Sequence, residues 1–413
     1  MTDQGTKALA AARRYEVDIV RFLREMIAIP AESCHEAERC ERVRNEYETL
    51  GFDEVFFDRL GNVVAKVGTG PLTILLDGHI DCVGVGDRQA WTYDPFEGEY
   101  ADGKVRGRGA VDELPAVTCM AYAVKILKER GFPEDVTIYL SATVMEEACD
   151  GYCLLHLIET EGIRPDVVVI GEPTDLNVYR GHRGRVEVTI TTRGVSSHAA
   201  HCERGVNALY KIAPIISDVD ALNAHLPEDD FLGKGSVVVS YIECTTPSLN
   251  AVPDSARIYI DRRLTAGETV ETAMAELRAL PHLGDATVEL LLYDATSWRG
   301  ERARQDKFYP TWVLPEEHAL VQGVADAAEA VLDTRPAISR WSFSTNGVAS
   351  MGRLGIPTVG FAPGREELAH TTDEWVLVDD LVRATAVYSL IPEYLAKLTD
   401  QFTAAEKQIA KSS

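Results

Sequence analysis

The feature that most constrains the fold of this 413-residue chain is an alternation of strands and helices that is interrupted once. Before residue 184, short apolar runs are typical of buried strands, and amphipathic segments lie between them. Strands are expected at residues 73–80, 136–144 and 167–170, and helices at residues 8–28 and 115–130. The second helix has Pro115 in its first turn and Gly131 just past its end. This alternation favours a mainly parallel sheet covered by helices.

The interruption covers residues 184–295, where apolar and polar residues alternate as in strands with one exposed face. Its segments are expected at residues 185–192, 207–218, 236–243, 256–264, 268–280 and 286–293. Their order, β-α-β-β-α-β, is that of a ferredoxin-like sandwich. After residue 296 the α/β pattern returns, with a strand at 356–361 and a closing helix at 379–395, bent at Pro392. We therefore predict an α/β domain formed by residues 1–183 and 296–413, with an inserted ferredoxin-like α+β domain at 184–295.

The charge of the chain excludes some kinds of partner. Sixty-five acidic residues against 41 basic residues give a net charge of −24, so no basic surface for nucleic acid or for an anionic membrane is expected. There is no apolar run of about 18 residues and no signal-peptide core at the N-terminus. The eight cysteines lack the spacing of a zinc ribbon or a redox motif. We expect a cytoplasmic protein with reduced cysteines that acts on a small molecule.

Ionisable residues follow the expected buried strands, at the sheet edge where α/β proteins bind ligands. His79 lies at the end of the strand expected at 73–80, and Asp81 directly follows it. Positions i and i+2 of a strand point to the same side, so His79 can bind a metal while Asp81 approaches its other ring nitrogen. The alternative is a core histidine with a satisfied hydrogen bond.

Five further ionisable residues are candidates, and each has a plain structural alternative. Asp112 precedes the helix at 115–130, where it can cap the helix or bridge two cations. Glu146 and Glu147 follow the strand at 136–144 and repel each other unless a positive charge is near. A surface position relieves that repulsion, but one glutamate can equally bind a metal while the other holds its water. Glu172 follows the strand at 167–170, and His370 lies in an irregular loop.

Together these histidines and carboxylates form a set that suits zinc, manganese or cobalt. Their motifs occur in the order Gly78-His-Ile-Asp81, Gly107-Arg-Gly-Ala-Val-Asp112, Glu146-Glu147, Gly171-Glu-Pro-Thr174 and Ala369-His370. With this order, essentially the whole chain resembles the aminoacylase, succinyl-diaminopimelate desuccinylase and carboxypeptidase G family of co-catalytic metallohydrolases. It is most similar to the branch described as selenium-metabolism-linked hydrolases.

The resemblance implies a role for each motif residue. One metal ion would be held by His79, Asp112 and Glu172, and a second by Asp112, Glu147 and His370, with Asp112 bridging. Glu146 would be the general base, with Asp81 beside His79. The inserted domain would be a lid and dimerisation domain, through which at least a homodimer forms. Its His198 would reach the active site of the partner subunit, and Arg263 and Asn250 would contact the substrate.

Three departures from the family pattern bear on the substrate. Glu113-Leu-Pro-Ala116 replaces the usual Lys-Gly-Gly-like segment after Asp112. Asn346 stands in a loop where many relatives carry an aspartate, and it is a candidate substrate contact. Trp341 and Phe343 add aromatic rings to the same segment.

The function expected is hydrolysis of a C–N amide bond in a small carboxylate-bearing substrate, such as an N-acyl amino acid or a dipeptide. One or two divalent ions, first of all Zn²⁺ but also Mn²⁺ or Co²⁺, would activate a water for Glu146. A hydrolytic deaminase of aromatic amines with the same machinery is the alternative. A non-catalytic binding protein is disfavoured, because the motif residues are all present. No serine-hydrolase elbow, dinucleotide fingerprint or Walker loop occurs.

Overall fold

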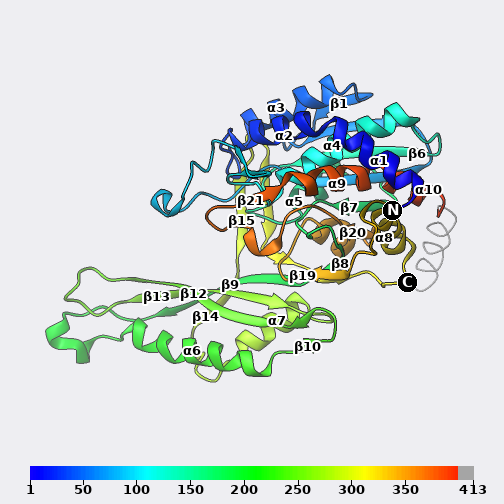
Figure 1. The fold of residues 1–413 in the computed structure, drawn as a ribbon. Coiled ribbons are helices and arrows are strands. Elements are labelled where there is room, and N and C mark those ends of the chain that lie inside the picture. Colours follow the sequence, from blue (N-terminus) through cyan, green and yellow to red (C-terminus); the bar gives the residue numbers. More distant parts are fainter. Residues whose placement is uncertain (399–413) are drawn as a thin grey trace.

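A computed structural model describes residues 1–398 and places them in two bodies (Figure 1). The larger body contains a sheet with helices on its faces, and the smaller body is a sheet with two helices on one side. Each has its own apolar core. The α/β class with an inserted antiparallel domain is therefore confirmed. Within residues 1–398, no helix has the length and apolar character to cross a membrane.

The sheet of the larger body is mixed but parallel at its centre. Its strands run in the order β1-β2-β6-β3-β7-β20-β8-β18, and β19 pairs with β8. The strands are β1 (Glu54–Phe57), β2 (Val63–Gly68), β3 (Leu72–His79), β6 (Val136–Thr143), β7 (Val167–Ile170), β8 (Val178–His182), β18 (Trp312–Val313), β19 (Ile338–Trp341) and β20 (Thr358–Gly360). Since β3 is parallel to both β6 and β7, the segments that follow these three strands meet at one sheet edge.

Helices cover this sheet, and two of the expected helices are broken. The helices of the larger body are α1 (Asp3–Arg14), α2 (Glu16–Ile27), α3 (Ala37–Thr49), α4 (Leu114–Arg130), α5 (Tyr152–Thr160), α8 (Ala319–Leu332), α9 (Val378–Tyr388) and α10 (Ile391–Ala396). The single helix expected at residues 8–28 is wrong, because the chain turns at Tyr15 between α1 and α2. The closing helix breaks between α9 and α10, and Pro392 lies in the first turn of α10 instead of bending one helix.

Two glycines allow α4 to lie against the strand ends that carry the site. A Cβ on Gly78 would lie 2.8 Å from Val117 Cγ2, and one on Gly171 would lie 2.5 Å from Ala116 Cβ. Both distances are too short for packed carbon atoms. The glycines of the two strand motifs thus bring the start of α4, and with it Asp112, close to β3 and β7.

The inserted body has the expected ferredoxin-like topology. Its strands β9 (Gly184–Arg193), β12 (Ser236–Thr245), β13 (Ser255–Leu264) and β14 (Thr287–Leu290) lie in the order β12-β13-β9-β14. Helices α6 (Ala208–Leu222) and α7 (Val270–Arg278) cover one face, where Val186, Val188, Ile258 and Ile260 are buried. The register pairs Arg263 with Arg185, so these side chains share the opposite, polar face.

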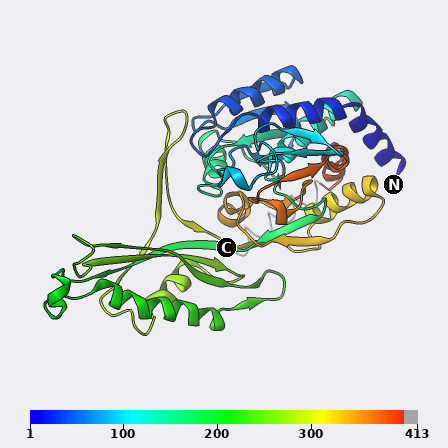
Figure 2. The same cartoon turned by 60° about the vertical axis from the view of Figure 1, so that its left-hand side comes forward.

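The last segment expected in the inserted domain divides into β14 and β15 (Leu292–Thr296). β15 pairs with β16 (Arg302–Asp306) in a long hairpin that reaches from the inserted body to the larger one (Figure 2). Trp298 at its tip donates a hydrogen bond to Gly61 O at 3.2 Å and packs edge-on against Phe57. After the hairpin, β17 (Phe308–Tyr309) returns to pair with β9. The domain limits at 183/184 and 295/296 stay a prediction.

Candidate metal centre

Two histidines and a carboxylate form the middle of the site. Asp112 lies between them, with Oδ1 2.9 Å from His79 Nε2 and Oδ2 3.0 Å from His370 Nε2. His79 ends β3, Asp112 precedes α4, and His370 lies in the loop after β20. The other ring nitrogen of His79 lies 2.9 Å from the backbone oxygen of Asp81, which fixes the ring and leaves Nε2 to face the site.

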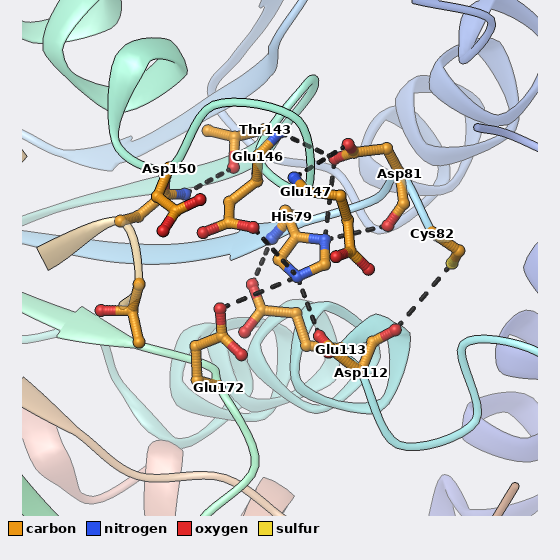
Figure 3. Close-up of polar contacts among 12 residues, drawn as sticks. His79, Asp81, Cys82, Asp112, Glu113, Thr143, Glu146, Glu147, Asp150 and Glu172 are labelled. Carbon is orange, nitrogen blue, oxygen red and sulfur yellow. Dashed lines mark hydrogen bonds and ion pairs between the residues drawn. The ribbon is translucent and has the colours of Figure 1, made fainter. Parts of the chain in front are cut away.

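Three glutamates surround this group (Figure 3). Glu147 Oε2 is 3.1 Å from His370 Nε2. Glu172 Oε1 and Glu146 Oε2 are 3.8 and 3.9 Å from His79 Nε2. The ligand atoms of His79, Asp112 and Glu147 all lie within 4.8 Å of one another. The structure therefore brings together every residue that the sequence predicted as a metal ligand, and Glu146 beside them.

The donor set fits divalent cations. Among the described residues, Glu146 Oε1 and Glu172 Oε2 are buried without a hydrogen-bond partner. Buried carboxylate oxygens without a partner are costly unless a cation or a proton compensates them. Two imidazoles with several carboxylates are a usual ligand set for zinc or manganese, and a carboxylate between two histidines can bridge two ions.

The charges of the site act strongly on one another. Burial raises the pKa of Glu146 well above its ordinary value, and the nearby charge of Asp150 adds to this. Burial alone lowers the pKa of His79, but the carboxylates of Glu113 and Asp112 outweigh burial and raise it well above normal. Burial raises the pKa of Asp112, but hydrogen bonds from His370 and His79 hold it below the ordinary value. This excess of buried negative charge is what bound cations would neutralise.

A second layer of carboxylates holds the backbone of the site. Asp81 Oδ1 and Oδ2 accept hydrogen bonds from the N–H groups of Glu146 and Glu147, at 3.1 and 3.2 Å. Glu36 Oε1 accepts one from the N–H of Met145 at 3.0 Å. Met145 has a left-handed φ of 64°, a conformation that a non-glycine residue keeps only when its surroundings fix it. This turn directs the Glu146 and Glu147 side chains into the site.

The carboxylate of Glu374 holds the backbone of the loop that carries Asp112. Its Oε1 accepts hydrogen bonds from the N–H groups of Val111 and Asp112, at 2.8 and 3.2 Å, while Arg108 donates to Oε2 at 2.6 Å. Glu113 Oε1 accepts one from the N–H of His79. These roles of Glu36, Glu113 and Glu374 were not predicted from the sequence. Glu113 directly follows Asp112, and Glu374 follows Asp373 in the loop of His370, so their positions beside motif residues were a signal. Nothing in the sequence pattern distinguishes Glu36 from a surface acid.

A cavity of about 700 Å³ opens beside the centre. Its lining includes Asp112, Glu146, Glu147, Glu172 and His370 of the centre and the lid arginines Arg185 and Arg263. Arg263 is held by Asp261, with contacts of 2.8 and 3.0 Å. Of the rings noted in the sequence, Phe343 lines the cavity together with Tyr179. Trp341 does not: it is buried, and its Nε1 donates to Pro173 O at 3.1 Å.

Three predicted residues, His198, Asn250 and Asn346, neither line this cavity nor contact the group of His79, Asp112 and His370. His198 and Asn250 lie in neighbouring loops of the lid, where the chain forms a bridge between His198 and Ala251. Their placement in one subunit leaves the role in a partner's site a prediction.

Asn346 is a correction to the expected substrate contacts, because its side chain is buried in the domain core. Its Nδ2 donates to Asp77 Oδ2 at 2.8 Å and to Thr143 Oγ1 at 3.1 Å. Its Oδ1 accepts from the N–H of Gly151 at 2.9 Å and from the Cys153 thiol at 3.1 Å. No position of the amide is left for a substrate. The amide is needed here because an ionised aspartate could not donate to Asp77.

Comparisons with known proteins agree with this centre. Residues 75–393 match the model of Peptidase family M20/M25/M40, and the chain belongs to this family of metallohydrolases that act on C–N bonds. The chain is 45% identical to the uncharacterized protein YgeY of Escherichia coli (strain K12) over 386 residues, which are 93% of this chain and 96% of YgeY. It is 31% identical to a succinyl-diaminopimelate desuccinylase of Methylorubrum extorquens over 373 residues, covering 86% of this chain and 91% of that enzyme.

The fold is also that of solved structures. The structure of the dipeptidase Dug1p from Saccharomyces cerevisiae superimposes with a TM-score of 0.74, covering 96% of this chain and 99% of Dug1p. The sequences are 15% identical, so this likeness shows the fold alone. The selenium-linked branch expected from the sequence stays a prediction.

Proposed function

We propose that this protein hydrolyses the amide C–N bond of a small carboxylate-bearing substrate, such as an N-acyl amino acid or a dipeptide. The observation that carries the proposal is the position of Glu146. Its buried carboxylate has one oxygen without a partner among residues 1–398 and lies beside His79, on the wall of a cavity that Arg263 also lines. A base, a cation site and a carboxylate clamp thus share one small space.

Each residue of the site has a separate role in the proposed reaction. His79, Asp112 and Glu172 would hold one divalent ion, and Asp112, Glu147 and His370 a second. Such ions supply Lewis-acid chemistry and make a water more acidic. Glu146 accepts the proton of the attacking water and returns it to the departing nitrogen. Zn²⁺ is the ion proposed first, and Mn²⁺ and Co²⁺ suit the same donors.

Arg263 is proposed to bind the substrate's carboxylate. A guanidinium group can form two parallel hydrogen bonds with a carboxylate, and Arg263 lines the same cavity as Glu146. The other lid arginine of the cavity, Arg185, is already bonded to Asp150 at 2.7 Å. Its present partner Asp261 lies on the same strand, so a substrate carboxylate would compete with it. His198 of a partner subunit is proposed to donate to the developing oxyanion.

We further propose that the protein acts as a homodimer or higher oligomer through the lid. β12 is an edge strand of the lid sheet, and its Val238, Tyr241 and Ile242 are 53, 60 and 47% exposed. Tyr210 on α6 is 80% exposed. An exposed apolar edge strand is an aggregation risk unless it is paired, and a two-fold dimer is the commonest way to cover such a surface.

A second candidate, hydrolytic deamination of an aromatic amine, is favoured by Phe343 and Tyr179 on the cavity wall. The same base and cations would direct water to a ring carbon, and ammonia would leave. The non-catalytic alternative is disfavoured, because the candidate ligands and Glu146 converge on one centre.

The test is turnover by metal-stripped protein, before and after addition of Zn²⁺, Mn²⁺ or Co²⁺. Acyl amino acids, dipeptides and aromatic amines form the panel, with detection of free amino acid and of ammonia as separate products. Metal-dependent release of amino acid is the expected result. Ammonia from aromatic amines alone would favour the second candidate, and full activity in metal-free protein would contradict both.

A further inference from the structure

Two buried glutamates meet beside His79, and each has one oxygen without a partner. Glu113 and Glu172 are 1 and 2% exposed, and within residues 1–398 neither Oε2 atom has a hydrogen-bond partner. Ligand atoms of His79, Glu113 and Glu172 lie within 4.8 Å of one another. Figure 3 shows the two carboxylates on the same side of the His79 ring.

The orientation of Glu113 is fixed by its other oxygen. Glu113 Oε1 accepts the N–H of His79, which fixes the carboxylate, and one oxygen of Glu113 lies within 4.8 Å of an oxygen of Glu172 and of a ring nitrogen of His79. Two oxygen ligands of one zinc-sized ion lie at most about 4.4 Å apart, twice a bond of about 2.2 Å. A shift of a few tenths of an ångström would therefore let one cation bind both carboxylates.

A cation compensates the buried negative charge of Glu113 and Glu172 better than a proton does. One shared proton would neutralise one carboxylate, and Asp112 and Glu146 would still add negative charge around the single imidazole of His79. Buried charge of one sign is costly unless it is paired or bound to metal. A divalent ion pairs with both orphaned oxygens together.

Resting on the metal centre of the proposed function, we propose that Glu113 is a further ligand of the ion held by His79, Asp112 and Glu172. One nitrogen and three carboxylates make this site richer in oxygen than the site of His370, Asp112 and Glu147. Carboxylate ligands suit Mn²⁺, whereas imidazole suits Zn²⁺. The two sites therefore differ in metal preference, and the site with Glu113 favours Mn²⁺ relative to its neighbour.

The test is metal binding by Glu113→Gln, measured without substrate. Glutamine still accepts the N–H of His79, but its amide nitrogen cannot bind a cation. Metal-free protein is titrated with Mn²⁺ while free Mn²⁺ is followed by electron paramagnetic resonance, and Zn²⁺ is measured by equilibrium dialysis. Wild type should bind two ions. In the variant, Mn²⁺ affinity at one site should fall about 10-fold or more, and Zn²⁺ affinity should fall less.

Glu36→Gln is the matched control. Glu36 is also fully buried and accepts a backbone N–H through Oε1, and its Oε2 has no partner in the described part of the chain, but it is bonded to the backbone of Met145 and does not line the cavity. Its glutamine variant should bind both ions as wild type does. If Glu113→Gln does not fold, Glu113→Asp keeps the charge but is one methylene too short to reach both His79 and the ion, and it should show the same loss.

The outcomes separate the two proposals. If wild type binds no divalent ion, the metal centre itself is wrong. If wild type binds two ions and the Glu113 variants bind them with unchanged affinity, the metal centre stands and Glu113 only anchors the backbone of His79.

Discussion

Glu36 Oε1 accepts a hydrogen bond of 3.0 Å from the backbone N–H of Met145, the residue just before the proposed base. Neither Glu36 nor Met145 touches the cavity, yet the bond holds the left-handed turn from which Glu146 and Glu147 enter the site. An unpaired buried N–H costs about 1–3 kcal/mol, enough to let this turn relax.

Replacing Glu36 by Met should therefore lower kcat about 10-fold, since about 1.4 kcal/mol corresponds to that factor. Methionine has a similar shape but accepts no hydrogen bond. KM should stay near wild type because the substitution does not touch the cavity, and metal content should fall less than kcat because Glu147 is only one of three proposed ligands of its ion. Steady-state kinetics and metal analysis measure these quantities. Glu36→Gln keeps the acceptor and should restore most of kcat. Equal losses in both variants would show that the charge of Glu36, and not its hydrogen bond, is what matters.

Asn346→Asp should destabilise the fold at neutral pH. Burial raises the pKa of Asp77 to about 6, while hydrogen bonds from Ser141 and Asn346 oppose that rise. A second carboxylate in place of the amide removes a donor and adds like charge, so the free energy of unfolding should fall by about 2–3 kcal/mol at pH 7. The new carboxyl can donate again when it is protonated, so the loss should shrink towards pH 4. Urea unfolding at the two pH values checks this, and a loss that does not depend on pH would contradict it.

This site shows what the sequence could and could not predict. The ends of buried parallel strands must meet at one edge, so His79, Glu147 and Glu172 were predictable from apolar runs followed by acids and a histidine. Asn346 was misplaced because a loop position was taken to face the substrate, whereas its amide completes a buried network around Asp77. Glu36 was missed because an acid before an amphipathic helix is ordinarily solvated.

Parts of the fold were also predictable from the sequence, and other parts were not. The ferredoxin-like order followed from period-two alternation, which survives in any strand with one exposed face. The break at Tyr15 did not follow, because α1 and α2 continue one helical pattern of buried residues on both sides of it. The hairpin of β15 and β16 was also unpredicted, since its packing depends on contacts such as Trp298 with Gly61, far away in sequence.

The adjacent glutamates should respond differently to the same substitution. Glu146→Gln keeps its shape but cannot accept a proton, so turnover should fall about 100-fold or more while both ions stay bound. Glu147→Gln weakens a proposed ligand, so it should lose metal as well as activity. Metal analysis beside single-turnover rates measures both. If Glu146→Gln loses metal and Glu147→Gln keeps it, the two roles must be exchanged.

His182 should make the fold sensitive to acid. Its Nδ1 accepts the N–H of Thr345 at 3.0 Å and its Nε2 donates to Pro310 O at 3.1 Å. Burial lowers its pKa from 6.5 to about 3. The unfolded chain binds the proton first, so the stability that neutral His182 contributes is complete above pH 6.5 and is lost as pH falls towards 3.

The expected slope from this one group is about 1.4 kcal/mol per pH unit between pH 6 and 4. Urea unfolding of metal-free protein at several pH values measures it, with His182→Asn as the comparison. Asparagine keeps an acceptor near the position of Nδ1 and does not titrate, so the variant should start less stable but lose less on acidification. Parallel curves for the two proteins would assign the acid sensitivity to other groups.

The last prediction concerns His198, which lies in an exposed lid loop and does not line the cavity of its own chain. Its Nδ1 accepts the N–H of Ala200 at 3.1 Å, so the neutral ring carries its proton on Nε2, which can donate. If a two-fold dimer brings this ring to the partner's cavity, Glu146→Gln and His198→Ala should each be nearly inactive alone. A mixed dimer would contain one site with both native residues, because one subunit supplies Glu146 and the other supplies His198. A sample made only of mixed dimers should therefore regain up to about half of the activity of wild-type dimers.

Subunits exchanged under mild denaturant and separated by two affinity tags provide the sample. His201→Ala in the same loop is the matched control and should stay active. A fully active monomer, or purified mixed dimers without any recovery, would contradict a role for His198 across the interface.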